Sequence, residues 1–171
     1  MFIKTITVVM LRENMKTINK LIFLDVDGVL NNAETKARTP SGFTGIMDSK
    51  VELLKKIVDE TAAKIVLSSD WRLMEIDNPD YIYLNKKLSK YNLNIYSKTP
   101  DINWRDRGDE IATWLDVYGA DAWVAIDDIF MLFETLPSEV FDNHVIITDE
   151  KYGLRDLDVK RAIEILNGEN M

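Results

Sequence analysis

The sequence predicts an α/β fold with a central, mostly parallel sheet. Short apolar runs rich in branched residues alternate with longer segments of helical periodicity, as in parallel sheets covered by helices. Polar residues follow several of these runs, and ligands of such sheets bind at the carboxyl ends of the strands. The 171 residues include no low-complexity tract and are enough for one globular domain with a real core.

Five apolar runs are predicted to be strands. In chain order they are Leu21–Leu24, Lys64–Ser69, Leu93–Ser97, Ala122–Asp128 and His144–Thr148.

Four segments between or after these strands are predicted to be helices. They are DSKVELLKKIVDETAA from Asp48, DYIYLNKKLSKYN from Asp80, RGDEIATWLDVYG from Arg107 and DLDVKRAIEILNG from Asp156. The first places Val51, Leu54, Ile57 and Val58 on one face, behind a cap at Asp48 or Ser49. Gly119 stops the third helix, and the fourth closes against Gly168.

Residues 1–19 are predicted to be an N-terminal extension of one domain that spans residues 20–171. Met15 opens MKTINKLIFLDVDG, a natural-looking start close to the first strand. Residues 1–14 are therefore interpreted as an extra strand, an oligomer contact or an upstream extension. The run FIKTITVVML lacks the basic start, apolar length and cleavage site of a signal peptide. No window reaches the roughly 18 apolar residues of a membrane span, so no membrane partner is expected.

Composition limits the partners and the metal chemistry. The absence of cysteine excludes a disulfide framework and thiolate metal sites, and it fits a cytoplasmic location. A formal net charge of -8 provides no global attraction to nucleic acid or anionic membrane. A nucleic-acid substrate would need a local basic patch or a metal ion.

Carboxylates gather at the predicted carboxyl edge of the sheet. Asp25 and Asp27 follow the first strand, and Asp127 and Asp128 end the fourth. Two carboxylates about 4 Å apart repel by about 4 kcal/mol at an effective dielectric constant near 20, so a converging group of them favours a divalent cation. With only oxygen ligands available, Mg²⁺ is the predicted ion, and it commonly acts beside phosphate.

The motif FLDVDGVLN resembles the nucleophile motif of the haloacid dehalogenase (HAD) superfamily of phosphotransferases. KIVLSSDWR, RGDEIATWL, AIDD and ITDEKYGL follow in the family's order, so the resemblance covers about residues 20–167. These segments are most similar to the HAD domain of Swiss-army-knife RNA repair proteins. They are more distantly similar to the phosphatase half of phage polynucleotide kinase-phosphatases. The resemblance implies a three-layer Rossmann-like HAD fold with a minimal cap and a role in nucleic acid repair.

The resemblance also implies roles for the acids. Asp25 would be the nucleophile that becomes an aspartyl phosphate. Asp27 would protonate the leaving oxygen and later activate water, with its pKa raised by the neighbouring acids. The Asp25 carboxylate, the Asp27 backbone carbonyl and Asp128 would hold Mg²⁺, with Asp127 close by or acting through water. Gly28 would allow the tight turn after the acids.

The phosphoryl group would be held by a strand-end hydroxyl and a basic residue. The hydroxyl is that of Ser68 or Ser69. The family usually has a lysine before its third helix, where this chain has Arg107, and Lys98 in YSKTP is the competitor. Arg107 is preferred because it begins the helix that leads to the Asp-Asp strand. No glycine-rich GK[ST] loop opens a helix, which argues against an NTP-driven kinase.

Substrate contacts are predicted from the loops beside these motifs. NNAETKARTPSGFTG, with Lys36 and Arg38, is interpreted as a short flap beside the site. Arg72 is a candidate for touching the substrate phosphate, and Trp71 for stacking on a base. Open members of the family often act on macromolecules or bulky phosphoesters, which implies a nucleotide or nucleic-acid end ahead of a small sugar phosphate, although the acidity of the chain argues the other way.

Several conspicuous residues have simpler interpretations. His144 is predicted to cap a strand or lie at the surface. Asp149 and the YGL turn are predicted to shape the rim of the site, with a possible contribution from Asp149 to the metal. Four other residues are expected in the core: Trp114, Trp123, Leu115 and Phe133.

The predicted function is a Mg²⁺-dependent phosphomonoester hydrolase that uses an aspartyl-phosphate intermediate. Its substrate would be a phosphorylated small molecule such as a nucleotide, or a nucleic-acid end. The alternative is a non-catalytic HAD-like protein that sequesters a nucleotide-like ligand. The presence of both Asp25 and Asp27 favours the enzyme, because a pure binder would not need both.

Overall fold

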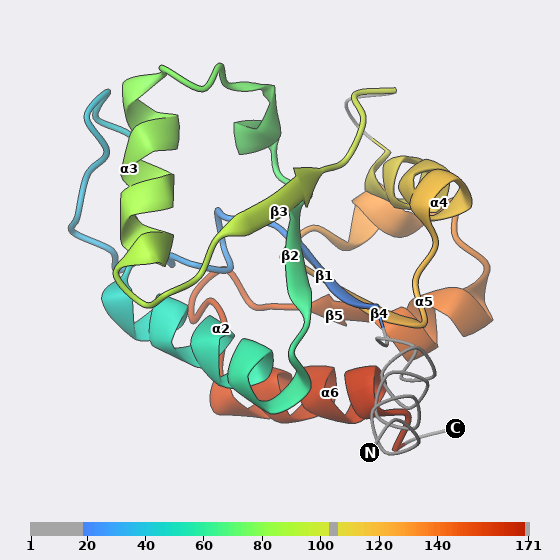
Figure 1. Ribbon diagram of the computed structural model, residues 1–171. Helices are drawn as coiled ribbons and strands as arrows, with labels where there is room; N and C mark the ends of the chain where they lie inside the picture. Colours follow the sequence, from blue (N-terminus) through green and yellow to red (C-terminus); the bar gives the residue numbers. More distant parts are fainter. Residues whose placement is uncertain (1–18, 103–105, 170–171) are drawn as a thin grey trace, which may run out of the picture.

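A computed structural model of the chain describes residues 19–102 and 106–169. In this part, five strands form one parallel sheet in the order β3-β2-β1-β4-β5 (Figure 1). Their bounds are β1 Lys20–Leu24, β2 Lys64–Leu67, β3 Ile95–Lys98, β4 Ala122–Asp127 and β5 Val145–Ile147. The order reverses between β1 and β4, and ligands of open α/β sheets bind at such a switch point. The predicted α/β fold is confirmed.

Helices cover both faces of the sheet and make three layers (Figure 1). One face packs against α2 (Asp48–Thr61), α3 (Pro79–Ser89) and α6 (Asp156–Asn167). The other packs against α4 (Arg107–Tyr118), α5 (Ser138–His144) and the 3₁₀ turn η2 (Phe130–Phe133). A second 3₁₀ turn, η1 (Asp70–Leu73), follows β2.

Strand β1 shows why the sheet lies in the middle of the molecule. Its side chains alternate between the faces, with Ile22 and Leu24 in the α2, α3 and α6 core and Leu21 and Phe23 in the α4 core. All four are at most 1% exposed. A strand buried on both faces reads as a continuous apolar run, which is the pattern that the sequence shows.

The helix boundaries correct part of the prediction. The predicted cap of α2 at Asp48 or Ser49 is wrong, because Asp48 is already helical and the cap position is Met47, without a side-chain bond. The Asp48 carboxylate instead accepts hydrogen bonds from Lys87 of α3 and from Lys90, which follows that helix. Helix α3 begins at Pro79 because the Asn78 side chain accepts from the backbone N–H of the first turn.

Each strand also differs from its predicted bounds by one or two residues, and the starts of β3 and β5 have clear causes. The strand predicted at Leu93 begins at Ile95, because Asn92 adopts a positive φ of 59° in the turn that ends α3. The strand predicted at His144 begins one residue later, because His144 ends α5, a helix that was not predicted. The His144 ring stacks on Trp123 with centroids 4.2 Å apart, and its Nδ1 lies 2.9 Å from the Trp123 carbonyl.

The four predicted core residues lie in the α4 layer, with Trp114 and Phe133 buried and the other two packed against them. Residues 25–47, between β1 and α2, contain no helix and only the isolated bridge Arg38–Thr44, consistent with the minimal cap. The interpretations of residues 1–14 lie outside the described residues. No helix in residues 19–102 or 106–169 has the length and apolar character that crossing a membrane requires.

Candidate active site

The carboxyl edge of the sheet is held together by backbone hydrogen bonds that continue past the strands. The N–H of Asp25 donates to the Ile126 carbonyl at 3.0 Å, and that of Ser68 donates to the Leu24 carbonyl at 2.8 Å. The Thr148 N–H donates to the Asp127 carbonyl at 2.8 Å. The residues after β1, β2 and β5 are thereby fixed relative to their neighbouring strands.

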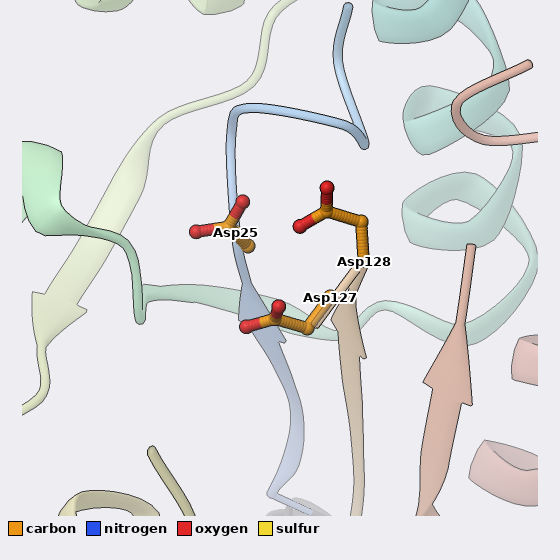
Figure 2. A group of neighbouring side chains, drawn as sticks. All are labelled: Asp25, Asp127 and Asp128. Atoms are coloured by element: carbon orange, nitrogen blue, oxygen red, sulfur yellow. The ribbon is translucent and has the colours of Figure 1, made fainter. Parts of the chain in front are cut away.

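Three carboxylates meet at the switch point. Oxygens of Asp25, Asp127 and Asp128 lie within 4.8 Å of one another (Figure 2). Burial raises the pKa of Asp25 well above its ordinary value, and the charge of Asp127 adds to this rise. Burial likewise raises the pKa of Asp127, and it raises the pKa of Asp128 to about 6 with the Asp127 charge as the second cause. The group is therefore costly to ionise without a cation.

Gly28 brings the loop after β1 against this group. Its φ is +72°, and a Cβ added there would lie 2.1 Å from Oδ2 of Asp128. A side chain at this position would need both a strained backbone and a displaced carboxylate. The glycine after the two aspartates is therefore required by the close approach.

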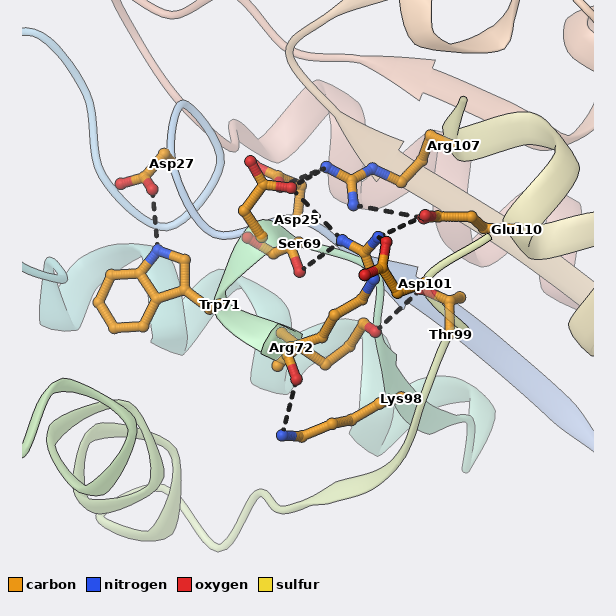
Figure 3. A network of polar contacts seen from close by, with 12 residues as sticks. Asp25, Asp27, Ser69, Trp71, Arg72, Lys98, Thr99, Asp101, Arg107 and Glu110 are labelled. Atoms are coloured by element: carbon orange, nitrogen blue, oxygen red, sulfur yellow. Dashed lines mark hydrogen bonds and ion pairs between the residues drawn. The ribbon is translucent and has the colours of Figure 1, made fainter. Parts of the chain in front are cut away.

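Arg107 is the cation that reaches the carboxylates. Its Nη2 lies 3.7 Å from Asp25 Oδ1, and its Nε lies 3.4 Å from Asp127 Oδ2. Lys98, the alternative, donates to the carbonyls of Arg72 and Met74 at 2.9 and 3.2 Å. The structure therefore brings Arg107, and not the Lys98 ammonium, to Asp25 (Figure 3).

Unpartnered donors accompany Arg107. Its Nε and Nη1 and the Ser68 hydroxyl are buried and form no hydrogen bond within the described part of the chain. The ion-pair contacts of Arg107 are too long or poorly aligned to satisfy these N–H groups. Buried polar groups normally have partners, so this orphaned set indicates a missing acceptor such as an anionic oxygen. The side chain of Ser69 instead contacts Asp25, where it lowers the pKa.

Arg72 lies behind Arg107 in a buried pair with Glu110. The Nη2 of Arg72 donates to Glu110 Oε1, and its Nη1 donates to the Ser69 carbonyl at 3.1 Å (Figure 3). Both side chains are 1% exposed. Oε2 of Glu110 also lies 3.8 Å from Nη1 of Arg107. Both terminal nitrogens of the guanidinium predicted to touch substrate phosphate are therefore engaged with protein groups, whereas its Nε is buried and forms no hydrogen bond within the described residues.

Asp27 lies apart from the three carboxylates and faces a different set of partners. Its Oδ2 accepts from the Trp71 indole N–H at 2.8 Å, and its Oδ1 accepts from the Asn31 side chain at 2.8 Å (Figure 3). Trp71 is 4% exposed, so most of its indole is core and not an open stacking surface.

A cavity of about 610 Å³ opens beside this site; Asp27 and Asp128 line it, whereas Asp25, Arg107 and Ser68 do not. Its twelve lining residues are Asp27, Gly28, Asn31, Asn32, Ala33, Phe43, Thr44, Asp70, Trp71, Met74, Asp128 and Glu150. The flap contributes Asn31, Asn32, Ala33, Phe43 and Thr44, and the structure does not bring Lys36 or Arg38 into the lining. Both of those side chains are exposed, and Arg38 donates to the carbonyls of Thr35 and Ala37. Asp149 accepts from Lys151 N–H in its own turn and lies outside the carboxylate group.

Sequence reasoning missed three residues of this site. Glu110 follows Arg107 by one helical turn, which is a spacing that could have paired them. Asn31 follows Asp27 by four residues in the same loop, but that interval indicates contact only where the chain is helical. Glu150 follows a strand-end aspartate on the rim and carries no motif of its own. Only Glu110 had a signal in the sequence that could have identified it.

A comparison with known families matches most of the chain. A family model described as the HAD domain in Swiss Army Knife RNA repair proteins matches residues 21–159. A search of curated proteins found no match. The matched range extends from β1 into α6 and contains every residue of the site described above.

Proposed function

The chain belongs to the family of HAD domains in Swiss Army Knife RNA repair proteins, and from this premise we propose that it is a Mg²⁺-dependent phosphomonoester hydrolase. The observation that carries the proposal is the pairing of two buried carboxylates and one half-buried carboxylate with orphaned cationic and hydroxyl donors at one sheet edge. Such a site has a place for a cation and a place for an anion. A phosphoryl group beside a divalent metal fills both.

The residues present fit Mg²⁺. Their donor set consists of carboxylate oxygens close enough together to gather around one small cation, with Asp25 and Asp128 as ligands and Asp127 beside them. The Asp27 backbone carbonyl would complete the protein ligands. When bound, Mg²⁺ offsets the negative charge of the carboxylates and of the phosphoryl oxygens.

In the first step, a carboxylate oxygen of Asp25 attacks phosphorus and the ester P–O bond breaks. The electron pair of that bond stays on the ester oxygen, which takes the carboxyl proton of Asp27 and leaves as an alcohol. Arg107 holds the phosphoryl oxygens through its free N–H groups, and the Ser68 hydroxyl donates to another of them. Asp25 is then an aspartyl phosphate.

In the second step, a water molecule attacks the phosphorus of the aspartyl phosphate. Asp27, now a carboxylate, takes a proton from that water. The bond between phosphorus and the Asp25 oxygen breaks, and its electron pair restores the Asp25 carboxylate. Inorganic phosphate leaves, and both aspartates return to their starting forms.

The cavity supports a nucleoside as the leaving group. Phe43, 65% exposed on the flap, and Met74 offer apolar surface for a base. Among the described residues, the lining includes Asp70 and Glu150 and has no lysine or arginine, so further phosphates are disfavoured there. We therefore assign the substrate as a nucleotide or the terminal nucleotide of a nucleic acid, with the rest of any chain outside.

The test is phosphate release from a substrate panel with Mg²⁺ and with EDTA. The panel comprises nucleoside 3′- and 5′-monophosphates, oligonucleotides with a 3′- or 5′-phosphate, and glycerol phosphate. We expect Mg²⁺-dependent release with kcat/KM about 5- to 150-fold higher for nucleotides than for glycerol phosphate, since stacking of one base is worth about 1–3 kcal/mol. Tight nucleotide binding without release from any ester would favour the non-catalytic binder.

Phe43→Ala tests the base contact inside this proposal. It should lower kcat/KM for the nucleotide and leave glycerol phosphate unchanged, because only the nucleotide reaches the flap. Ile76→Ala is the matched control, since Ile76 is 82% exposed and does not line the cavity. Equal losses of Phe43→Ala on both esters would remove the base contact.

A further inference from the structure

We propose that Trp71, together with Asn31, is a positioning residue that aims the carboxyl group of Asp27 at the leaving oxygen. The inference rests on the proposed function, because it requires Asp27 to transfer a proton. It goes further by giving a structural tryptophan and a loop amide a defined part in the reaction.

The two contacts divide the oxygens of Asp27 between them. The Trp71 N–H donates to Oδ2 and the Asn31 amide donates to Oδ1, each at 2.8 Å. A carboxyl group with one donor can still rotate about that bond, whereas donors on both oxygens fix its plane. Each oxygen keeps a further lone-pair direction, so a leaving oxygen in the cavity can still be reached.

Both donors are themselves held in place. The Trp71 indole lies in the core packed by α2, α3 and α6, and η1 carries it directly after the serines of β2. Asn31 is 3% exposed, and its Oδ1 accepts the Gly28 N–H at 2.8 Å. The side chain of Asp27, in contrast, is exposed on the cavity wall. An exposed acid is thus oriented by two buried donors.

Orientation matters for this step because proton transfer requires the acid within about 2.6–3.2 Å of the leaving oxygen. The need for the proton depends on the ester. An alkoxide is a poor leaving group and requires protonation as the P–O bond breaks. A dinitrophenolate leaves without it, so an enzyme with a misplaced acid should fail selectively on the alkyl ester.

The experiment compares two esters in Trp71→Phe, which removes the indole N–H and keeps an aromatic ring. For a nucleoside 5′-monophosphate we expect kcat/KM to fall about 10- to 100-fold, part of the 10²–10⁴-fold that general acid catalysis contributes. For 2,4-dinitrophenyl phosphate we expect less than about a threefold loss. Asn31→Ala should show the same selectivity with a smaller loss.

Trp114→Phe is the matched control. Trp114 is also buried, at 3% exposure, and its Nε1 donates to Ser97 Oγ at 3.1 Å, away from the cavity. This variant should retain both activities. Equal losses on the two esters in Trp71→Phe would show that Trp71 only packs, and would overturn the inference while the phosphatase assignment stands. Wild-type protein without turnover of either ester would overturn the proposed function and this inference with it.

A spectroscopic measurement covers the case in which Trp71→Phe does not fold. In the wild-type chain the Trp71 indole N–H is bonded to a carboxylate, so Asp27→Ala should move its ¹H–¹⁵N resonance and leave that of Trp114 in place. An unmoved Trp71 resonance would overturn the inference.

Discussion

The two sides of the site are built in opposite ways. The phosphoryl side brings charged groups together and leaves some donors unpaired. It consists of Asp25, Asp127, Asp128 and Arg107, and three of these four residues are buried. On the leaving-group side, Asp27 is exposed, yet both of its oxygens have donors. The buried groups on the phosphoryl side thus include unpaired donors, whereas the exposed carboxylate on the leaving-group side is paired at both oxygens.

The difference indicates what each side of the site is arranged to bind. Groups that are costly when bare become favourable when a cation and an anion arrive, so the phosphoryl side is arranged for ligands that bind and leave with every turnover. The leaving-group side is arranged for one acid that stays in place while its alcohol partner changes. Substitutions on the first side should therefore affect metal, phosphate and stability together, and those on the second should affect chemistry alone.

The largest effect is expected from Asp25→Asn. Loss of the nucleophile should lower kcat by about 10⁴–10⁶-fold, as removal of other covalent nucleophiles does. The melting temperature in EDTA should be unchanged or higher, because the variant removes a buried charge. Asp27→Asn, the comparison on the other side, should slow turnover severely and leave the melting temperature unaltered. Near-normal activity of the Asp25 variant would eliminate the covalent mechanism.

Arg107→Ala is expected to have the next largest effect. One charge-assisted contact is worth about 1.5–3 kcal/mol, so kcat/KM at saturating Mg²⁺ should fall about ten- to hundredfold. Arg107→Lys should retain more activity, since a point charge replaces part of the fork. Lys98→Ala should matter least, because its ammonium is bonded to backbone carbonyls. Metal affinity is measured separately. If Lys98→Ala lost activity while Arg107→Ala behaved like wild type, Lys98 and not Arg107 would be the cation that contacts the phosphoryl group.

Asp128→Asn should change stability more modestly, and in a pH-dependent way. The pKa of Asp128 is raised from an ordinary 3.8 to about 6, so the folded state loses stability as the pH rises through this interval. Asparagine cannot ionise, so the variant avoids that loss of stability. In EDTA the variant should melt about 2–4 °C above wild type at pH 7.5, with a smaller difference at pH 5.

Added Mg²⁺ sharpens the same measurement. It should raise the melting temperature of the wild type by mass action and that of Asp128→Asn much less. A variant that melts below wild type in EDTA at pH 7.5 would show that the carboxylates are not a destabilising group.

The smallest effect is expected from Lys36→Ala and Arg38→Ala. Both side chains are exposed and outside the cavity lining, so kcat/KM for a mononucleotide should stay within about twofold of wild type at physiological salt. The activity assay is repeated with a phosphorylated oligonucleotide. A tenfold loss on the mononucleotide would place these cations against the substrate and contradict the contrast drawn here.

The sheet and its acids could be predicted from the sequence because their signals are local. A strand buried on both faces is an uninterrupted apolar run, and a residue just after it must lie at the sheet edge. Asp25, Asp127 and Asp128 follow from that rule. Helix α5 did not, because PSEVFDNHV has too few turns for periodicity to distinguish it from a loop before a strand.

The parts that escaped prediction depend on distant pairings. The flap was correctly seen as a loop, but its position is set by Asp80, which accepts from Ser41 N–H, and by the Tyr83 hydroxyl, which accepts from Ile46 N–H. Trp71 was a candidate for stacking on a base. Its bond to Asp27 could not be predicted, because that bond joins residues 44 positions apart. No spacing along the chain reports such a contact.

The backbone bonds that extend each strand into the site have a consequence for hydrogen exchange. The amides of Asp25, Ser68 and Thr148 are donors to neighbouring strands, so none of them can exchange with solvent unless two strands separate. Their exchange should therefore follow opening of the central sheet and not loop fluctuation. We therefore expect the amides of Asp25 and Ser68, which would meet the phosphate, to be among the last to exchange.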